Sequence, residues 1–227
     1  MCGICGNISP ETSQKKETVK KINQKLTHRG PDFGAVLDID EMAIFAHRRL
    51  SIIDLSELAH QPMQDLSKNY TITYNGEVYN FQEIKDELLS YGYRFKSRSD
   101  TEVVLYSYIH WGVECFKKFN GMFSLAIWNS KEKELLLARD RFGKKPLYYT
   151  LLNNEITFSS ELTALLEDEE IKNKVTLSIP ALNHYLALGY ILHPLTIYKE
   201  IYKVEPAGYI KFRNGKITEK KRYWEYK

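Results

Sequence analysis

Met1-Cys2-Gly3-Ile4-Cys5-Gly6 opens the chain, and Cys2 is small enough for the initiator methionine in front of it to be removed. The processed chain would carry a thiol and an α-amine on the same residue. The pKa of an α-amine, about 7.7–8.0, lies close to that of a thiol, about 8.5, so the amine can act as the base for its own nucleophile. The apolar run 3–8 then predicts a buried first strand. The opening therefore predicts a reactive group at the end of a core strand.

The same residues allow other interpretations, because Cys2 and Cys5 form a C-x-x-C pair. A structural zinc ion needs four ligands, and Cys115 is the one other thiol, so histidines such as His28 and His47 would have to complete the set at irregular spacing. A redox C-x-x-C usually opens a helix after a strand, whereas this one opens the chain. A small buried core residue is the third interpretation of Cys2.

The composition limits the class of protein. With 227 residues, 43% of them hydrophobic, the chain can form one α/β unit with a substantial core. Its net charge of +3 comes from interleaved charges, so we expect no nucleic-acid partner. No apolar run reaches about 18 residues and no signal peptide is visible, so we expect no membrane partner. An odd number of cysteines, three, indicates a reducing compartment, and the cytoplasm is the expected localisation.

The hydrophobic periodicity predicts blocks of helices and of antiparallel hairpins, which is typical of stacked sheets with helices on their outer faces. We expect one domain, with a loosely attached end after about residue 211. Helices are predicted at 16–27, at 81–91 with Gly92 ending the helix, from 99 onward and at 179–188. Strands are predicted at 42–46, 70–74, 122–128, 134–139, 147–151, 155–158, 209–212 and 216–218. The strand at 70–74 is expected to end at Asn75-Gly76.

An arginine pair at the end of a predicted strand supplies a candidate binding residue. Arg48 and Arg49 would point to opposite faces, so one of them can enter a pocket. A guanidinium there offers a bidentate fork that suits a carboxylate. The alternative is a solvated pair beside Asp54.

Two further positions are candidates. Asn75-Gly76 would ordinarily predict a hairpin turn, but the residues that follow lead into a helix and not into a partner strand. The Asn75 side-chain amide and the Gly76 backbone N–H are two neighbouring donors, which an oxyanion hole requires. Asp100 either caps the helix that begins there or holds a substrate ammonium.

Taken together, these segments resemble the class II glutamine amidotransferases. The segments that carry the resemblance are 2–6, the loop His28-Arg29-Gly30-Pro31-Asp32, and residues 48–54, 74–80 and 99–102. Residues 119–123, 138–149 and 222–224 narrow it to the glutaminase domain of glutamine-hydrolysing asparagine synthetases. The resemblance spans essentially the whole chain.

The resemblance implies an α+β fold of the N-terminal-nucleophile hydrolase type, a four-layer α/β/β/α sandwich of two antiparallel sheets. Residues 2–211 would form the glutaminase domain, and 212–227 an end segment leading to a synthetase domain. The catalytic residues implied are Cys2, Asn75 and Gly76: Cys2 would attack the side-chain amide of L-glutamine, and the other two would stabilise the oxyanion. A γ-glutamyl thioester would form and be hydrolysed to glutamate.

The resemblance also implies a glutamine-binding set. Arg49 would bind the α-carboxylate, and Glu77 and Asp100 the α-ammonium, while Cys5 would be a core residue. The complete implied set is Arg49, Leu50, Ser51, Ile52, Ile53, Asn75, Gly76, Glu77 and Asp100.

The synthetase relatives continue with an ATP-pyrophosphatase domain that carries a Ser-Gly-Gly-x-Asp-Ser loop, and this sequence contains no such loop. We therefore expect no metal and no cofactor in this chain, with ATP and Mg²⁺ used by a synthetase domain supplied in cis or in trans. The chain is either an excised N-terminal domain or a stand-alone glutaminase. Its partners would be L-glutamine, the synthetase domain and, as an open question, a second copy in a homodimer.

The sequence is compatible with three interpretations of the function. Aspartate is the default ammonia acceptor, which would make the product asparagine. Sugar-modifying and secondary-metabolite-forming amidotransferases share the domain design. In the third interpretation, the chain is a non-catalytic regulatory module that binds glutamine.

Overall fold

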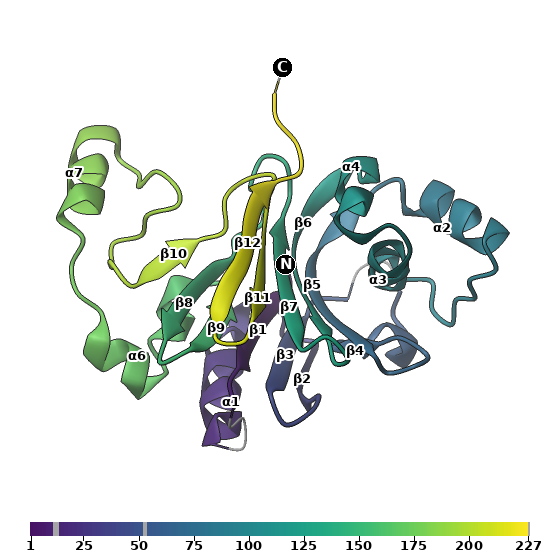
Figure 1. Cartoon of the computed structure of the whole chain (residues 1–227), viewed down its shortest axis with the longest axis horizontal. Coiled ribbons are helices and arrows are strands. Elements are labelled where there is room, and N and C mark those ends of the chain that lie inside the picture. The colour runs from purple at the N-terminus through teal and green to yellow at the C-terminus, as the bar shows by residue number, and fades with distance from the viewer. Residues whose placement is uncertain (11–13, 52–53, 227) are drawn as a thin grey trace.

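Two antiparallel sheets pack face to face and carry helices on their outer sides in the computed structural model, which describes residues 1–10, 14–51 and 54–226 (Figure 1). Within these residues each sheet has six strands. The first has the order β10-β8-β9-β1-β3-β2 and the second the order β12-β11-β7-β6-β5-β4. The arrangement confirms the predicted α+β class and the four-layer sandwich.

The first sheet contains β1 (Gly3–Ile8), β2 (Phe33–Asp38), β3 (Ala43–Arg49), β8 (Tyr148–Leu152), β9 (Glu155–Ser159) and β10 (Ile201–Lys203). The second contains β4 (Met63–Gln64), β5 (Tyr70–Val78), β6 (Gly121–Asn129), β7 (Glu134–Arg139), β11 (Gly208–Arg213) and β12 (Lys216–Arg222).

The helices form the outer layers. Helix α1 (Lys16–Lys25) covers the first sheet, and α2 (Phe81–Ser90), α3 (Asp100–Trp111) and α4 (Cys115–Lys118) lie on the side of the second (Figure 1). Helices α5 (Leu162–Leu165), α6 (Glu169–Lys174) and α7 (Ile179–Leu188) follow β9. Short 3-10 turns connect some of these elements: η2 (Thr27–Arg29), η3 (Glu57–Ala59) and η4 (Gly112–Glu114). Among the described residues, no helix is long and apolar enough to cross a membrane.

The first strand is buried along its whole length, as its apolar sequence predicts. Because side chains alternate across a strand, Ile4 and Ile8 pack between the sheets, whereas Cys5 packs with Val19 of α1. Gly6 faces the inter-sheet core, where a Cβ atom would lie 2.6 Å from the Phe158 ring. This close packing between the layers fixes the position of β1.

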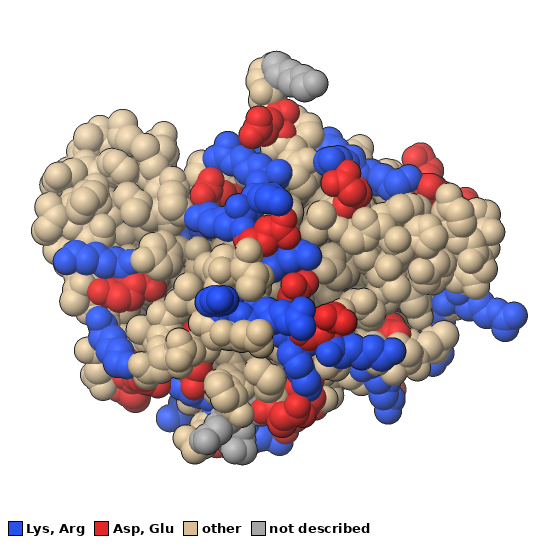
Figure 2. Space-filling view, in the orientation of Figure 1, with Lys and Arg blue, Asp and Glu red and all other residues tan. Residues whose placement is uncertain are grey.

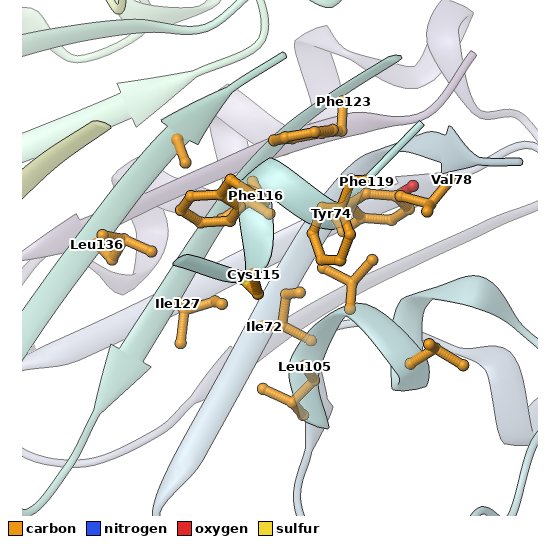
Figure 3. Close-up of a cluster of buried hydrophobic side chains, with 14 of the residues drawn as sticks. Ile72, Tyr74, Val78, Leu105, Cys115, Phe116, Phe119, Phe123, Ile127 and Leu136 are labelled. Carbon is orange, nitrogen blue, oxygen red and sulfur yellow. The ribbon is translucent and has the colours of Figure 1, made fainter. Parts of the chain in front are cut away.

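A second core lies between β5, β6 and the helices α2–α4. Phe116, Phe119 and Phe123 pack together there beside Tyr74, as Figure 3 shows. The Tyr223 ring also contacts Phe116, with 5.3 Å between the ring centroids. The residues after β12 are therefore part of this core.

The structure differs from the sequence-based prediction along the second sheet, where β4 was not predicted and β12 extends beyond residue 218. Strand β5 does not end at Asn75-Gly76, because β6 pairs with it as far as Val78. The predicted division after residue 211 falls inside β11, and β12 pairs with β11 as the edge of the sheet, so the end segment is not loosely attached. That residues 212–227 lead to a further domain stays a prediction.

Helix α7 is predicted correctly but is unusually apolar on its outside. Ser178 caps it by accepting a hydrogen bond from the Ala181 N–H, and Ala181 is its one buried residue. Tyr185, Leu186 and Leu188 are exposed. Figure 2 shows this uncharged lobe beside the mixed positive and negative residues that lie over β12.

We predict that the packing of the aromatic core makes a large contribution to the free energy of unfolding. Phe116→Ala should lower the free energy of unfolding by about 3–5 kcal/mol, because Phe116 is fully buried and its ring contacts would be replaced by a cavity. Leu186→Ala is the matched control: Leu186 is 74% exposed, so the change should stay within about 0.5 kcal/mol. Urea unfolding measures both, and equal losses would contradict the prediction.

Candidate active site

A cavity of about 200 Å³ opens where the start of β1 and the ends of β3 and β5 meet the start of α3. Seven residues of the predicted set line it: Cys2, Arg49, Leu50, Asn75, Gly76, Glu77 and Asp100. Ser51 does not; its backbone N–H donates to the Asp32 carboxylate at 2.8 Å. Ile52 and Ile53 lie outside the described residues. The volume is below the usual 300–1,000 Å³ of drug-sized sites and suits a ligand as small as an amino acid.

Cys2 precedes β1 and is held by backbone groups. Its Sγ lies 3.5 Å from the Leu50 N–H and 3.8 Å from the Leu50 carbonyl, and its own carbonyl accepts a hydrogen bond from Arg29 Nε at 2.9 Å. Burial raises the pKa of the Cys2 thiol, while the Leu50 N–H, the N-terminal ammonium and Arg49 act in the opposite direction. The thiol is therefore desolvated but has donors and positive charge beside it, which favour the thiolate.

The N-terminal amine, carried here by Met1, lies at the same cavity. Burial lowers the pKa of this amine, and Arg29 and Lys145 lower it further against the opposing effect of Cys2. A lowered pKa favours the uncharged form, which can accept a proton.

The two adjacent arginines do point to different places, as predicted. Arg49 is buried and lines the cavity, and its Nη1 donates to the Ser56 carbonyl at 3.0 Å and its Nη2 to the Asp54 carbonyl. Arg48 instead donates to the Asn23 carbonyl on α1 at 3.1 Å. The carbonyl contacts orient the Arg49 guanidinium, whose charge is available to an anion in the cavity.

Asn75 and Gly76 are neighbours on β5 and both line the cavity. The Asn75 side chain is buried, and its Nδ2 has no hydrogen-bond partner in the described part of the chain. A buried donor without a partner is costly unless a ligand accepts from it. A Cβ at position 76 would lie 2.5 Å from the Met122 carbonyl oxygen, so only glycine allows β6 to pair here. The pair thus presents an unused donor beside a closely packed backbone.

Asp100 begins α3, but neither it nor Ser99 makes a side-chain cap. Its Oδ2 accepts hydrogen bonds from the Tyr74 hydroxyl at 2.7 Å and from the Val78 N–H at 3.0 Å. Burial raises the pKa of the Asp100 carboxyl, and these two donors oppose the shift. Asp100 therefore ties α3 to β5 and presents a carboxylate at the cavity wall.

The three thiols occupy three different environments. Cys5 lies on the opposite side of β1 from the cavity, with its Sγ 4.0 Å from the Val19 carbonyl, and burial raises its pKa. Cys115 is buried in the core beneath α3. Among the described residues, no group of three or more His, Cys, Asp or Glu side chains is arranged to hold a metal. This placement does not support the zinc and redox interpretations of the C-x-x-C pair.

Hydrogen bonds between the sheets hold the two halves of the cavity together. His47 on β3 is completely buried, and its Nε2 lies 3.1 Å from the Tyr74 carbonyl on β5, to which it must donate. One residue earlier on each strand, the Thr73 hydroxyl donates to the Ala46 carbonyl at 3.2 Å. Gln61 accepts from the Tyr74 N–H at 2.7 Å. These bonds fix the distance between Cys2 and the donors on β5.

The sequence-based prediction missed several residues of the cavity wall, including Gln61, Tyr74, Met122 and Lys145. The segment 138–149 contributes to the family resemblance, but nothing in its residue pattern indicates that Lys145 lines the cavity. The wall residues come from loops and strands far apart in the chain, so spacing alone could not group them.

Comparison with known proteins agrees with this geometry. A family described as "Glutamine amidotransferase domain" matches residues 1–224. The chain is 40% identical over 225 residues to asparagine synthetase [glutamine-hydrolyzing] 1 of Bacillus subtilis, covering 97% of this chain and 35% of that protein. It is 37% identical over 243 residues to putative asparagine synthetase [glutamine-hydrolyzing] 2 of Methanocaldococcus jannaschii, covering 99% and 47%.

The fold is also similar to a solved structure of glutamine phosphoribosylpyrophosphate amidotransferase from B. subtilis. The TM-score is 0.70 at 17% sequence identity, over 99% of this chain and 50% of the other. At this identity the similarity concerns the fold, and it confirms the predicted α+β sandwich of two antiparallel sheets. The chain belongs to the glutamine amidotransferase domain family, and it spans about a third to a half of the length of the two synthetases named above.

We predict that His47 makes the fold sensitive to acid. Burial lowers the pKa of His47 to about 3, so the folded chain keeps it neutral while the unfolded chain protonates it below about pH 6.5. The contribution of neutral His47 to the free energy of unfolding is thus present above about pH 6.5 and is lost as the pH falls toward 3. Between about pH 7 and pH 5 the loss amounts to about 2 kcal/mol. Urea unfolding at the two pH values measures the loss.

The controls separate His47 from other titrating groups. His47→Gln should keep a donor for the Tyr74 carbonyl and show a loss smaller by about 2 kcal/mol. His28→Gln removes an exposed histidine, and this variant should lose as much stability between the two pH values as the wild type does. An equally steep pH dependence in His47→Gln would contradict the assignment.

Proposed function

We propose that this chain hydrolyses L-glutamine to glutamate and ammonia, with Cys2 as the nucleophile after Met1 has been removed. The observation that carries the proposal is the convergence in one cavity of a thiol, an unpartnered amide donor, a guanidinium and a carboxylate: Cys2, Asn75, Arg49 and Asp100. These are the groups needed to attack, stabilise and hold an amino-acid amide.

Binding would orient the substrate by its two charges. Arg49 binds the α-carboxylate, and Asp100 with Glu77 binds the α-ammonium, as the charges of the cavity wall favour. The side-chain amide then lies toward Cys2 and the Asn75-Gly76 donors. The Leu50 backbone, already in contact with Cys2 Sγ, would line the site.

The chemistry then needs two steps. The α-amine of Cys2 takes the thiol proton, the sulfur forms a bond to the amide carbon, and the Asn75 side chain and the Gly76 N–H stabilise the resulting oxyanion. The amine returns its proton to the leaving nitrogen, and ammonia departs as the carbon–nitrogen bond breaks. Water attacks the γ-glutamyl thioester that remains, which releases glutamate and the free thiol.

The ammonia would serve an amide synthesis elsewhere. The names of the relatives describe glutamine-hydrolysing asparagine synthetases, so we propose an ATP- and Mg²⁺-dependent synthetase domain, in cis or in trans, with aspartate as the acceptor. We assign no metal or cofactor to this chain. The three unpaired cysteines are consistent with the proposed cytoplasmic localisation.

Cys2→Ala should abolish glutamate release because the variant lacks the nucleophile. Cys5→Ala is the matched control: it removes a thiol three residues away that packs against α1, so it should remain active. A glutamate dehydrogenase-coupled assay measures both rates. Full activity in Cys2→Ala would show that Cys2 is not the nucleophile. If Cys5→Ala folds but is inactive, Cys5 is also needed, as the C-x-x-C interpretation requires.

Asn75→Ala tests the oxyanion site. We expect kcat to fall by about 10²–10³ with little change in KM, since the donor acts on charge that develops in the transition state. Stability should hardly change, because the Asn75 Nδ2 that is lost has no partner in the described part of the protein. A normal kcat would remove Asn75 from the mechanism, and a rise in KM alone would make it a binding residue.

A further inference from the structure

Lys145 is a buried lysine in the wall of the active-site cavity. It is 6% exposed, and within the described residues its ammonium makes no hydrogen bond or ion pair. Lysine is almost never fully buried unless it is paired. A charged side chain in this position therefore indicates a role at the cavity.

The backbone that carries Lys145 is firmly held. The carboxylate of the buried Asp140 accepts hydrogen bonds from the Lys145 N–H at 3.0 Å and from the Phe123 N–H on β6 at 3.2 Å. The Arg139 guanidinium donates to the Lys145 carbonyl at 2.6 Å and to the Val204 carbonyl at 2.9 Å. These hydrogen bonds hold the loop between β7 and β8 in place and thereby fix the backbone of Lys145 beside the cavity.

Lys145 acts electrostatically on both groups of the N-terminus. It lowers the pKa of the N-terminal amine. Its own pKa is lowered by burial and by Arg29, and is raised by Cys2, Asp140 and Glu77. The backbone nitrogen of Cys2 lies between the Met1 amine and the Cys2 thiol along the chain. The amine created there by removal of Met1 would therefore be within range of the same charge.

Arg29 is the second cation that lowers the pKa of the N-terminal amine, and it is already engaged in other interactions. Arg29 donates to the Cys2 carbonyl at 2.9 Å and to the Glu161 carboxylate at 2.9 Å, so much of its charge is compensated. Lys145 makes no ion pair in the described residues, although the Asp140 and Glu77 carboxylates lie near enough to raise its pKa. The charged and titratable groups that face the N-terminus and Lys145 from all sides are Cys2, Arg29, Asp32, Arg49, Glu77, Asp100 and Asp140.

We propose, resting on the glutaminase function above, that Lys145 is a positioning residue that works through its charge. Its ammonium keeps the α-amine of mature Cys2 uncharged at neutral pH, so that the amine can take the thiol proton. A positive charge in the wall of the same partly desolvated cavity disfavours a second positive charge there, and it stabilises a thiolate at the same time. Both effects extend activity toward lower pH.

The test is the pH dependence of kcat/KM for glutamine hydrolysis, which reports the essential groups of the free enzyme. Lys145→Met removes the charge at similar side-chain length, and its acidic limb should move to higher pH by about one unit. Lys145→Arg restores the charge and should keep the wild-type limb. Lys144→Met is the matched control, because Lys144 is the exposed neighbour on the same loop.

Each outcome separates the possibilities. A Lys145→Met profile lowered by the same factor at every pH, or left unchanged, would overturn the inference and leave Lys145 a structural residue. A shift of the same size in Lys144→Met would also overturn it. If Lys145→Met does not fold, Lys145→Gln replaces it with the same expected shift.

The wild type reports on the underlying function. Intact mass first confirms loss of Met1 in every variant, so that the same amine is compared. Failure of the wild type to hydrolyse glutamine would reject the proposed function itself. Hydrolysis by the wild type with an unshifted Lys145→Met profile would reject only the role of Lys145.

Discussion

The structure depends on the packing of two antiparallel sheets against each other, because each sheet carries one half of the active-site cavity. Cys2 and Arg49 lie at the ends of strands in the first sheet, and Asn75-Gly76 lies within a strand of the second. The buried His47 and the Thr73 hydroxyl make hydrogen bonds across the interface just beneath the cavity. A shift of one sheet along the other would break these bonds and separate the thiol from the amide donor.

Burial explains why the site can be reactive. Partial removal of water raises the pKa of the Cys2 thiol and lowers that of the amine at the N-terminus. The two shifts bring uncharged forms of both groups to neutral pH, and nearby cations then favour the thiolate once a substrate is bound. The same desolvation strengthens the hydrogen bonds that Asn75 and Gly76 can offer to a developing oxyanion.

The sequence was sufficient to predict the layers and the main members of the site. The apolar run after Cys2, the arginine pair and the Asn75-Gly76 step each have local patterns that the structure places at one cavity. The continuation of β5 through Asn75-Gly76 was not predictable locally, because a strong turn signal is overridden by pairing with β6. The edge strand β12 depends in the same way on a distant partner.

The contributions of Tyr74 and Lys145 could not be read from the sequence for a different reason. Tyr74 looks like an ordinary core residue of a strand, and its hydroxyl matters only because Asp100 meets it from another element. Lys145 follows Lys144 in a basic run of a kind that is usually exposed to solvent. Its backbone is held beside the cavity by hydrogen bonds to the Asp140 carboxylate and from the Arg139 guanidinium. Roles that arise from contacts between distant segments require the three-dimensional structure.

The central claim, that a processed Cys2 attacks glutamine in this cavity, is tested most directly by intact mass before and after incubation with 6-diazo-5-oxo-norleucine, a reactive glutamine analogue. The account predicts a chain lighter by one methionine that gains a single adduct, located on Cys2. A chain that retains Met1 and gains no adduct would contradict it.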